Sequence, residues 1–301
     1  MCFRRAEGHR EMVCICLVCR ELFFRDCNSR ENGFSCIFTI CRNFPTTLPP
    51  KPYSYMGFAE MNIRGIVKFS LIDYPGKIAC VIFVGCCNFR CPYCHNPHLV
   101  VDPESQPELL QSSVIDFLEE RRGKLDAVVV SGGEPTLRPK LMEFLRIVKG
   151  LGLSVKIDTN GTNTEVIQHL NNEGLVDSLG IDYKAPKSKY AIVAGRDNRR
   201  MIENVFRTLE YAVVEKIHLD VRTTVHKALL DEDDLKTMRN ELDDMGIEEW
   251  TLQQFNPVDI IDENLKKVET FTNTELVQIV ERLGGRTKTR GIIELMVLPP
   301  Q

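Results

Sequence analysis

The stretch GCCNFRCPYCHNP, residues 85–97, directly follows an apolar run that ends at Val84. It holds three cysteines, Cys87, Cys91 and Cys94, separated by three and then two residues. This spacing brings three sulfur atoms to one side of a short loop, where they can bind one iron-sulfur cluster. Such clusters are usually held by four cysteines, so a loop with three leaves one iron atom open to a ligand that is not protein.

Other interpretations of this loop stay open from the loop alone. Three cysteines together with His95 are a chemically sensible zinc site, because zinc accepts thiolate and imidazole ligands in a closed tetrahedron. Three buried thiols acting as small hydrophobic side chains are the less favoured interpretation, because the loop is polar. The neighbouring thiol of Cys86 raises the question of alternative ligation, and Cys87 is preferred because only it gives the three-residue gap to Cys91.

Composition indicates an ordinary globular enzyme. The 301 residues suffice for one large α/β domain or two small ones, and 43% of them are hydrophobic. A formal net charge of -4 gives no general attraction to nucleic acid or to an anionic membrane, so we expect neither as a partner. Seven of the 12 cysteines lie at or before Cys41, and the other five lie between Cys80 and Cys94. This distribution argues against a disulfide-stapled fold and predicts a reducing, cytoplasmic location.

Residues 1–60 differ from the rest of the chain. They show no sustained helical or strand period, and they contain the breakers Pro45, Pro49, Pro50 and Pro52. The apolar run 12–19 is too short to span a bilayer. The six cysteines between positions 14 and 41 fit no familiar zinc spacing, so a small metal module is the less favoured alternative. We expect residues 1–60 to be an N-terminal extension, mistranslated or disordered, outside a domain of residues 61–301, and intact-mass measurement of the native protein tests this.

Strand and helix patterns alternate from Ile78 onward. Apolar strand runs are expected at residues 78–84, 125–130, 154–158, 178–182, 217–225 and 249–255, each followed by an amphipathic helix. Repeated strand-helix units predict parallel strands. Six units predict an α/β fold, a partial (β/α)6 TIM-like barrel. A further apolar run, 292–297, closes the sequence.

Unusual residues follow the predicted strands, where the active sites of such barrels lie. A Gly-Gly pair removes side chains, so the backbone can approach a ligand closely, although without the cysteine loop a plain tight turn is the favoured interpretation. Arg222 could grip a carboxylate in its fork of donors, and an internal pair with Asp182 or Asp220 competes with that role. In chain order the strand ends carry Cys87–Cys94, Gly132-Gly133-Glu134, Asp158-Thr159-Asn160-Gly161, Asp182-Tyr183-Lys184, Arg222-Thr223-Thr224 and Gln253-Gln254.

These motifs together resemble a known family. The three-cysteine loop, with Tyr93 just before the last cysteine, and Ser131-Gly132-Gly133-Glu134-Pro135 about forty residues later resemble the radical S-adenosylmethionine superfamily. Within it, residues 88–97 look most like the activating enzymes of glycyl radical enzymes, particularly the one that serves anaerobic ribonucleoside-triphosphate reductase. The resemblance extends from about Met61 to the C-terminus and makes zinc improbable.

The resemblance implies the roles of the site residues. Cys87, Cys91 and Cys94 would bind a 4Fe-4S cluster whose open iron is chelated by the amino and carboxylate groups of S-adenosylmethionine. His95 and Asn96 would border the adenine and the substrate glycine, and Lys184 would meet the ligand or the partner. The residues expected to contact the cofactor are Tyr93, Gly132, Gly133, Glu134, Asp158, Asn160 and Arg222, with a capped turn as the alternative for Asp158 and Asn160.

The resemblance also implies the reaction. One electron, supplied by a flavodoxin- or ferredoxin-like donor, would cleave S-adenosylmethionine, and the resulting 5′-deoxyadenosyl radical would take a hydrogen atom from a glycine of a glycyl radical enzyme. Anaerobic ribonucleotide reductase is the expected partner. Alternatives are a related enzyme that modifies a nucleobase precursor or a peptide, and a carrier that holds an iron-sulfur cluster without catalysis.

Overall fold

The chain divides into two compact units, Met1–Tyr55 and Met56–Gln301. The computed structural model describes residues 61–291 and the backbone of two short strands nearer the N-terminus. These strands, β1 (Glu11–Ile15) and β2 (Leu22–Asp26), pair antiparallel, with Glu11 opposite Asp26. Sequence inspection had predicted no strand in this region. The cysteine side chains before Cys80 and the apolar run 292–297 lie outside the described residues.

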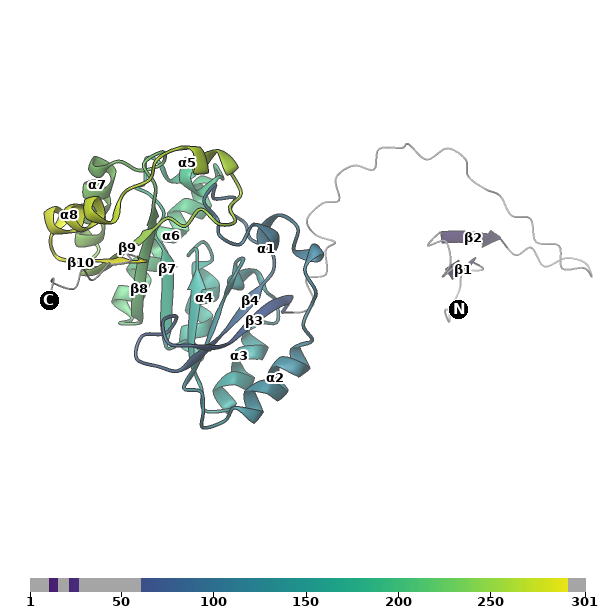
Figure 1. The fold of residues 1–301 in the computed structure, drawn as a ribbon. Coiled ribbons are helices and arrows are strands. Elements are labelled where there is room, and N and C mark those ends of the chain that lie inside the picture. The colour runs from purple at the N-terminus through teal and green to yellow at the C-terminus, as the bar shows by residue number, and fades with distance from the viewer. Residues whose placement is uncertain (1–10, 16–21, 27–60, 292–301) are drawn as a thin grey trace, which may run out of the picture. The chain divides into compact units, whose positions relative to one another are not determined.

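The second unit is built on one sheet of eight strands in the described residues, in the spatial order β10-β9-β8-β7-β6-β5-β4-β3 (Figure 1). Strand β3 pairs antiparallel with β4, and every other neighbouring pair is parallel. The strands are β3 (Ile63–Ser70), β4 (Ala79–Val84), β5 (Ala127–Gly132), β6 (Ser154–Thr159), β7 (Ser178–Asp182), β8 (His218–Val225), β9 (Glu249–Gln254) and β10 (Arg286–Arg290). The predicted partial barrel is confirmed, with two strands beyond the six expected.

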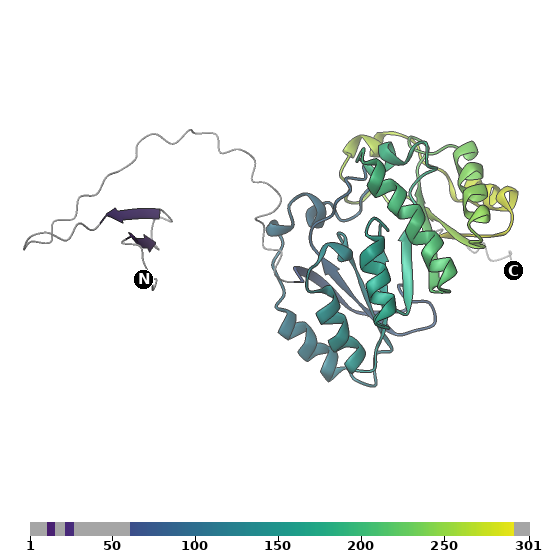
Figure 2. The ribbon, with the colours of Figure 1, turned by 180° about the vertical axis from the view of Figure 1, so that it is seen from behind.

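The longer helices follow the parallel strands and cover one side of the sheet, as the view from behind shows (Figure 2). The α-helices are α1 (Pro97–Val101), α2 (Gln111–Glu120), α3 (Leu141–Gly150), α4 (Thr164–Asn172), α5 (Tyr190–Ala194), α6 (Arg199–Val214), α7 (Glu232–Asp244) and α8 (Asn273–Leu283). Short 3-10 turns are η2 (Pro103–Ser105), η3 (Pro135–Leu137) and η4 (Glu263–Lys267). None of these helices is both long and apolar enough to cross a bilayer.

Both faces of β4 are buried, which explains its continuous apolar sequence. Cys80 and Ile82 belong to the large core beneath the helices. Ala79 and Val81 point the other way, into a smaller cluster inside the barrel that Tyr74 joins. Tyr74 is therefore a packing residue of this smaller cluster.

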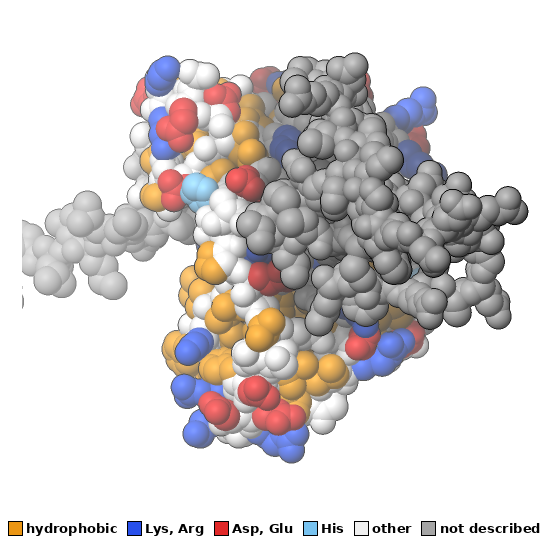
Figure 3. Space-filling model, turned by 90° about the vertical axis from the view of Figure 1, so that its right-hand side faces the viewer, with side chains coloured by type: hydrophobic (Ala, Val, Ile, Leu, Met, Phe, Trp, Pro, Cys, Tyr) orange, Lys and Arg blue, Asp and Glu red, His pale blue; other side chains and the backbone are white. Residues whose placement is uncertain are grey.

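The inner face of the sheet changes character along its width. It is apolar at β4 and β5 and becomes ionic from β6 onward. The ionic part contains Lys156 and Asp158 of β6, Asp182 of β7, and Asp220 and Arg222 of β8. On the outer surface, by contrast, basic and acidic side chains are mixed with hydrophobic ones over the face shown in Figure 3.

Candidate active site

A cavity of about 290 Å³ lies at the carboxyl ends of the strands. The three predicted cluster ligands, Cys87, Cys91 and Cys94, line it together. Of the seven residues predicted to contact the cofactor, six also line it: Tyr93, Gly132, Gly133, Asp158, Asn160 and Arg222. The cysteine loop after β4 and the carboxyl-terminal parts of β5, β6 and β8, with the residues that directly follow β5 and β6, therefore bring distant parts of the sequence to one place.

The cysteine loop is held close against the end of β5. Cys86 adopts a φ of 67°, and its carbonyl oxygen accepts a hydrogen bond of 2.7 Å from the backbone N–H of Glu134. A Cβ atom on Gly133 would lie 2.0 Å from that oxygen, which no side chain can tolerate. Gly132 has a φ of 106°, a conformation that favours glycine. The Gly-Gly pair is thus required by the close approach of two loops.

Glu134 is fully buried and is not among the residues lining the cavity. Its Oε1 accepts hydrogen bonds from the backbone and hydroxyl of Thr136, at 3.0 and 2.5 Å, and from the hydroxyl of Thr159 at 2.7 Å. Its Oε2 accepts from the backbone N–H of Asn160 at 2.8 Å. Burial raises the pKa of this carboxyl, although the hydrogen bonds act in the opposite direction. The side chain braces the loop after β6.

Asn160 connects the loop after β6 to the cysteine loop. Its side-chain N–H donates to Oδ1 of Asn88 at 2.7 Å and lies 3.8 Å from the sulfur of Cys87. Asn88 in turn donates to the hydroxyl of Thr162 at 2.8 Å. Hydrogen bonds therefore connect the loops after β4, β5 and β6 in one series.

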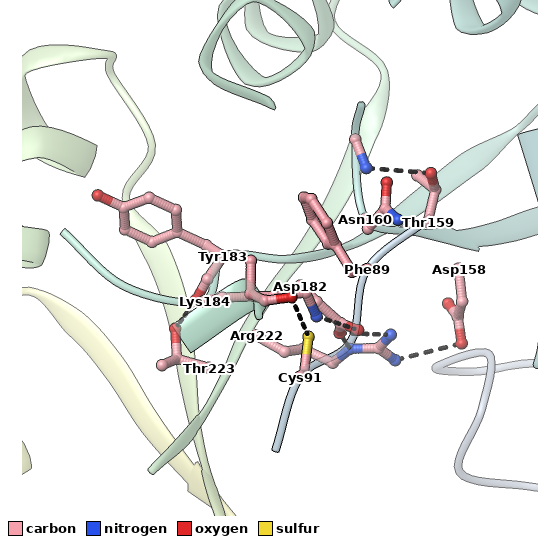
Figure 4. Close-up of polar contacts among 12 residues, drawn as sticks. Phe89, Cys91, Asp158, Thr159, Asn160, Asp182, Tyr183, Lys184, Arg222 and Thr223 are labelled. Carbon is pink, nitrogen blue, oxygen red and sulfur yellow. Dashed lines mark hydrogen bonds and ion pairs between the residues drawn. The ribbon is translucent and has the colours of Figure 1, made fainter. Parts of the chain in front are cut away.

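Arg222 lies in the ionic part of the barrel, between two carboxylates (Figure 4). Its guanidinium nitrogens lie 3.3 Å from Asp158 and 3.2 Å from Asp182, and a third carboxylate, that of Asp220, is 3.7 Å away. The structure thus shows that Arg222 is paired with Asp182 and Asp220, the alternative to carboxylate binding that the sequence left open. Burial alone would raise the pKa of Asp182, but Lys184 and Arg222 lower it below its ordinary value.

Lys184 supplies a second buried positive charge beside the thiols. Its ammonium lies 3.4 Å from a carboxylate oxygen of Asp182 and 5.8 Å from the ring centre of Tyr93. Burial raises the pKa of Cys87 to about 12 and that of Cys91 to about 11, and the charge of Lys184 acts against both shifts. Both thiols are therefore protonated near neutral pH, and binding a metal as thiolates releases protons.

The residues fit an iron-sulfur cluster better than one metal ion. Among the described side chains, no three His, Cys, Asp or Glu gather as they would around a single ion. A cluster binds each thiolate through a different iron atom, so its ligands stand farther apart. His95, the fourth ligand of the zinc alternative, instead places Nε2 2.9 Å from the carbonyl oxygen of Asn256. Three thiols line one cavity together with Gly132 and Gly133, which have no side chains to fill it. This arrangement suits a cluster with one open iron.

Asp73 is a cavity residue that sequence reasoning missed. It lines the cavity from the loop after β3 and accepts a hydrogen bond from the hydroxyl of Ser70. No local signal in the sequence distinguishes it from a turn residue, because its position depends on how this loop folds against the barrel. Thr224, Gln253, His95 and Asn96 also line the cavity.

A partial barrel with three cysteine thiols at the carboxyl ends of its strands defines an enzyme that works through an iron-sulfur cluster. Comparison with known proteins gives the family. Residues 81–240 match the model of the Radical SAM superfamily. The chain belongs to the radical S-adenosylmethionine superfamily, as its motifs predicted, and is a radical S-adenosylmethionine enzyme. The family implies a 4Fe-4S cluster and S-adenosylmethionine as cofactors.

Similar proteins include two of different activity. A protein of Methanocaldococcus jannaschii named as a glycyl-radical enzyme activating enzyme is 36% identical over 72% of this chain and 89% of its own length. An S-adenosylmethionine-dependent nucleotide dehydratase of a Thermoplasmatales archaeon is 28% identical over 47% of this chain and 50% of its own length. Among solved structures, Streptococcus suis SuiB bound to precursor peptide SuiA is similar in fold, with a TM-score of 0.55 and 14% identity over 70% of this chain and 48% of that one.

Proposed function

We propose that this chain activates a glycyl radical enzyme. The observation that carries the proposal is the similarity to the Methanocaldococcus jannaschii protein that has this function in its name. That protein is 36% identical to this chain, and the similarity covers 89% of its length. When bound, the cluster and S-adenosylmethionine supply, on one-electron reduction, a 5′-deoxyadenosyl radical that takes a hydrogen atom from a glycine. The partner we propose is anaerobic ribonucleoside-triphosphate reductase, and the electron donor is a flavodoxin- or ferredoxin-like protein.

The chain's own residues have distinct roles in this proposal. Cys87, Cys91 and Cys94 hold the cluster, and their loop is fixed by the contact of Cys86 with Gly133 and Glu134. The backbone at Gly132 and Gly133, which lines the cavity, would receive the methionine amino group. Residues proposed to border the rest of the cofactor are Tyr93, Asp158, Asn160 and Arg222, whereas Glu134 is a positioning residue.

The charges of the cavity favour this activity over nucleotide modification. A nucleotide substrate brings phosphates, which proteins usually bind with free cationic side chains. Among the described residues that line the cavity, Lys184 and Arg222 carry positive charge, and both are ion-paired with Asp182. A neutral polypeptide segment needs no such cation.

The test is radical formation on the partner. The full chain is reconstituted anaerobically with iron and sulfide, mixed with S-adenosylmethionine, dithionite and anaerobic ribonucleotide reductase of the same host, and examined by electron paramagnetic resonance. We expect a glycyl radical signal that is absent with the Cys91→Ala variant. Cleavage of S-adenosylmethionine without a radical on the reductase would show that this partner is wrong.

A further inference from the structure

Exposed basic side chains gather in segment 187–207, which holds α5 and the first half of α6. This segment contains six basic residues and two acidic ones, Asp197 and Glu203, whereas the whole chain has a net charge of -4. Among the described residues, the only ion pair of the five exposed basic side chains joins Arg199 to Glu203 at 2.8 Å. We call these five the basic surface: Lys187, Arg196, Arg199, Arg200 and Arg207.

The basic surface is built around α6. Arg199 and Arg207 lie two turns apart on one face of this helix, because residues four apart are neighbours on a helix surface. Lys187 joins the same helix, with its ammonium 5.4 Å from the centre of the Phe206 ring. Ile192 of α5 is 71% exposed and adds an apolar side chain to the segment. Arginines together with an apolar side chain are a typical composition of protein–protein interfaces.

The turn between α5 and α6 contacts the cysteine loop directly. The carbonyl oxygen of Ala194 accepts a hydrogen bond of 2.9 Å from the backbone N–H of Arg90 and lies 3.8 Å from the sulfur of Cys91. Arg196 donates a hydrogen bond of 3.2 Å from Nε to the carbonyl oxygen of Asn88. The basic surface therefore begins where the chain touches a predicted cluster ligand.

This contact is separate from the cavity. None of the described residues 187–207 lines the cavity, although Cys91 does. Cys91 is thus reached from two sides, from the cavity and through the backbone of Ala194. An electron can enter by the second side while the cavity holds S-adenosylmethionine.

We propose that the basic surface is the docking site of the protein that supplies the electron, and that this donor presents an acidic face. The proposal rests on the proposed function and locates the donor on the chain. Opposite charges on two proteins speed and orient their encounter, and complexes of redox partners are small and transient. The donor loses one electron and the cluster gains it, so no bond forms or breaks and no proton moves in this step.

The experiment measures electron transfer from a protein donor to the reconstituted full chain with S-adenosylmethionine present. The probe is an acidic flavodoxin in its hydroquinone form. Stopped-flow absorbance follows the flavin semiquinone that appears when the flavodoxin loses one electron. This readout does not depend on cleavage of S-adenosylmethionine.

The test variant combines Arg200→Glu with Arg207→Glu, which reverses two charges of the basic surface. Arg196 is left unchanged because it contacts the cysteine loop. The matched control combines Arg122→Glu with Lys124→Glu, which reverses two exposed charges between α2 and β5. These residues precede the amino end of β5, whereas the cysteine loop lies at the carboxyl ends of the strands.

We expect the test variant to raise the flavodoxin concentration that half-saturates semiquinone formation about tenfold at low ionic strength. About 1 M salt should remove most of this difference, because it shortens the screening length to about 3 Å. The control keeps the wild-type value. With dithionite, a small reductant that needs no docking site, all three proteins should make equal amounts of 5′-deoxyadenosine.

Equal half-saturating concentrations in the test variant and the wild type would overturn the docking site. A wild-type chain that dithionite reduces but flavodoxin does not would overturn recognition of an acidic donor. A lower glycyl radical yield on the reductase in the test variant, with dithionite as reductant, would assign the basic surface to the reductase instead. A wild-type chain that accepts electrons from flavodoxin but makes no 5′-deoxyadenosine would overturn the proposed function.

Discussion

Cys86 and Cys87 are adjacent, yet the structure places them in different surroundings. Cys87 lines the cavity. Cys86 turns away through its positive φ, and its sulfur lies 3.8 Å from the side-chain nitrogen of Asn62. The preference for Cys87, made from spacing alone, agrees with this geometry.

Substitution of the two cysteines should therefore have opposite results. We expect Cys87→Ser to lose most of the bound iron, because a cluster then has two thiolates in place of three. Cys86→Ser keeps the iron, because its sulfur is outside the cavity. Iron and acid-labile sulfide per chain, measured after anaerobic reconstitution, decide this. Equal loss in both variants would show that Cys86 is also a ligand.

Glu134 is expected to act through position rather than contact. Both of its carboxylate oxygens accept hydrogen bonds, so Glu134→Gln places amide N–H groups against existing donors and leaves a buried group unsatisfied, at a cost of about 1–3 kcal/mol. We predict about tenfold weaker binding of S-adenosylmethionine by calorimetry, with the cluster retained. Glu143→Gln, on the exposed side of α3, is the control. Wild-type affinity in Glu134→Gln would contradict the positioning role.

At the scale of elements, the sequence located the buried parallel strands closely. The run 178–182 is β7 to the residue, and 154–158 is one residue shorter than β6. Both strands bury apolar residues, Val155 and Ile157 in β6 and Leu179 and Ile181 in β7, and each is preceded by a turn, so their signal is strong. Helices with one apolar face were found for the same reason.

The elements that were missed depend on their neighbours. Strand β10 reads RTKTR and has no apolar residue. It forms because its backbone pairs with β9, and Arg286 and Lys288 make ion pairs with Glu248 and Glu249 at 3.2 and 3.0 Å. Helices α1 and α5 have five residues each, too few for a periodic signal. The cysteine and glycine motifs could be found because they are local, whereas the roles of Asp73 and Glu134 depend on loops brought together by the fold.

The junction of β5 with the cysteine loop can be tested by adding a single methyl group. A Cβ on Gly133 would lie 2.0 Å from the Cys86 carbonyl oxygen, so Gly133→Ala must displace the cysteine loop. We expect the variant to lose most of its bound iron and to unfold at lower temperature. Gly150→Ala is the control, because nothing lies within 4 Å of its new methyl group and alanine favours the helix. Normal iron content in Gly133→Ala would contradict the tight junction.

At the scale of the whole molecule, one ionic network joins strands β6, β7, β8 and β10 inside the barrel. Lys156 is fully buried and pairs with Asp158 at 2.6 Å and Asp220 at 3.3 Å, and Arg290 reaches Asp220 at 3.3 Å. Burial alone would raise the pKa of Asp220, but Arg222, Lys156 and Arg290 lower it below its ordinary value of 3.8. Removing one partner from a buried ionic network typically costs about 3–5 kcal/mol.

This network predicts how stability depends on pH. Because the pKa values of Asp182 and Asp220 are lowered on folding, the unfolded chain binds more protons near and below the ordinary Asp value. The stabilisation is therefore complete above about pH 5 and is lost as the pH falls through the lowered pKa values. Urea unfolding between about pH 3 and pH 7 measures it. Asp220→Asn should be less stable at neutral pH and lose less on acidification, and an equal acid loss in both proteins would contradict this assignment.

The central claim is that this chain cleaves S-adenosylmethionine through a cluster held by Cys87, Cys91 and Cys94. The most direct measurement is 5′-deoxyadenosine formed by the anaerobically reconstituted full chain with S-adenosylmethionine and dithionite, beside Cys91→Ala prepared identically. We predict product from the wild type and none above background from the variant. A wild-type chain that binds a cluster and yields no product would support an iron-sulfur carrier, and one that binds only zinc would contradict the account.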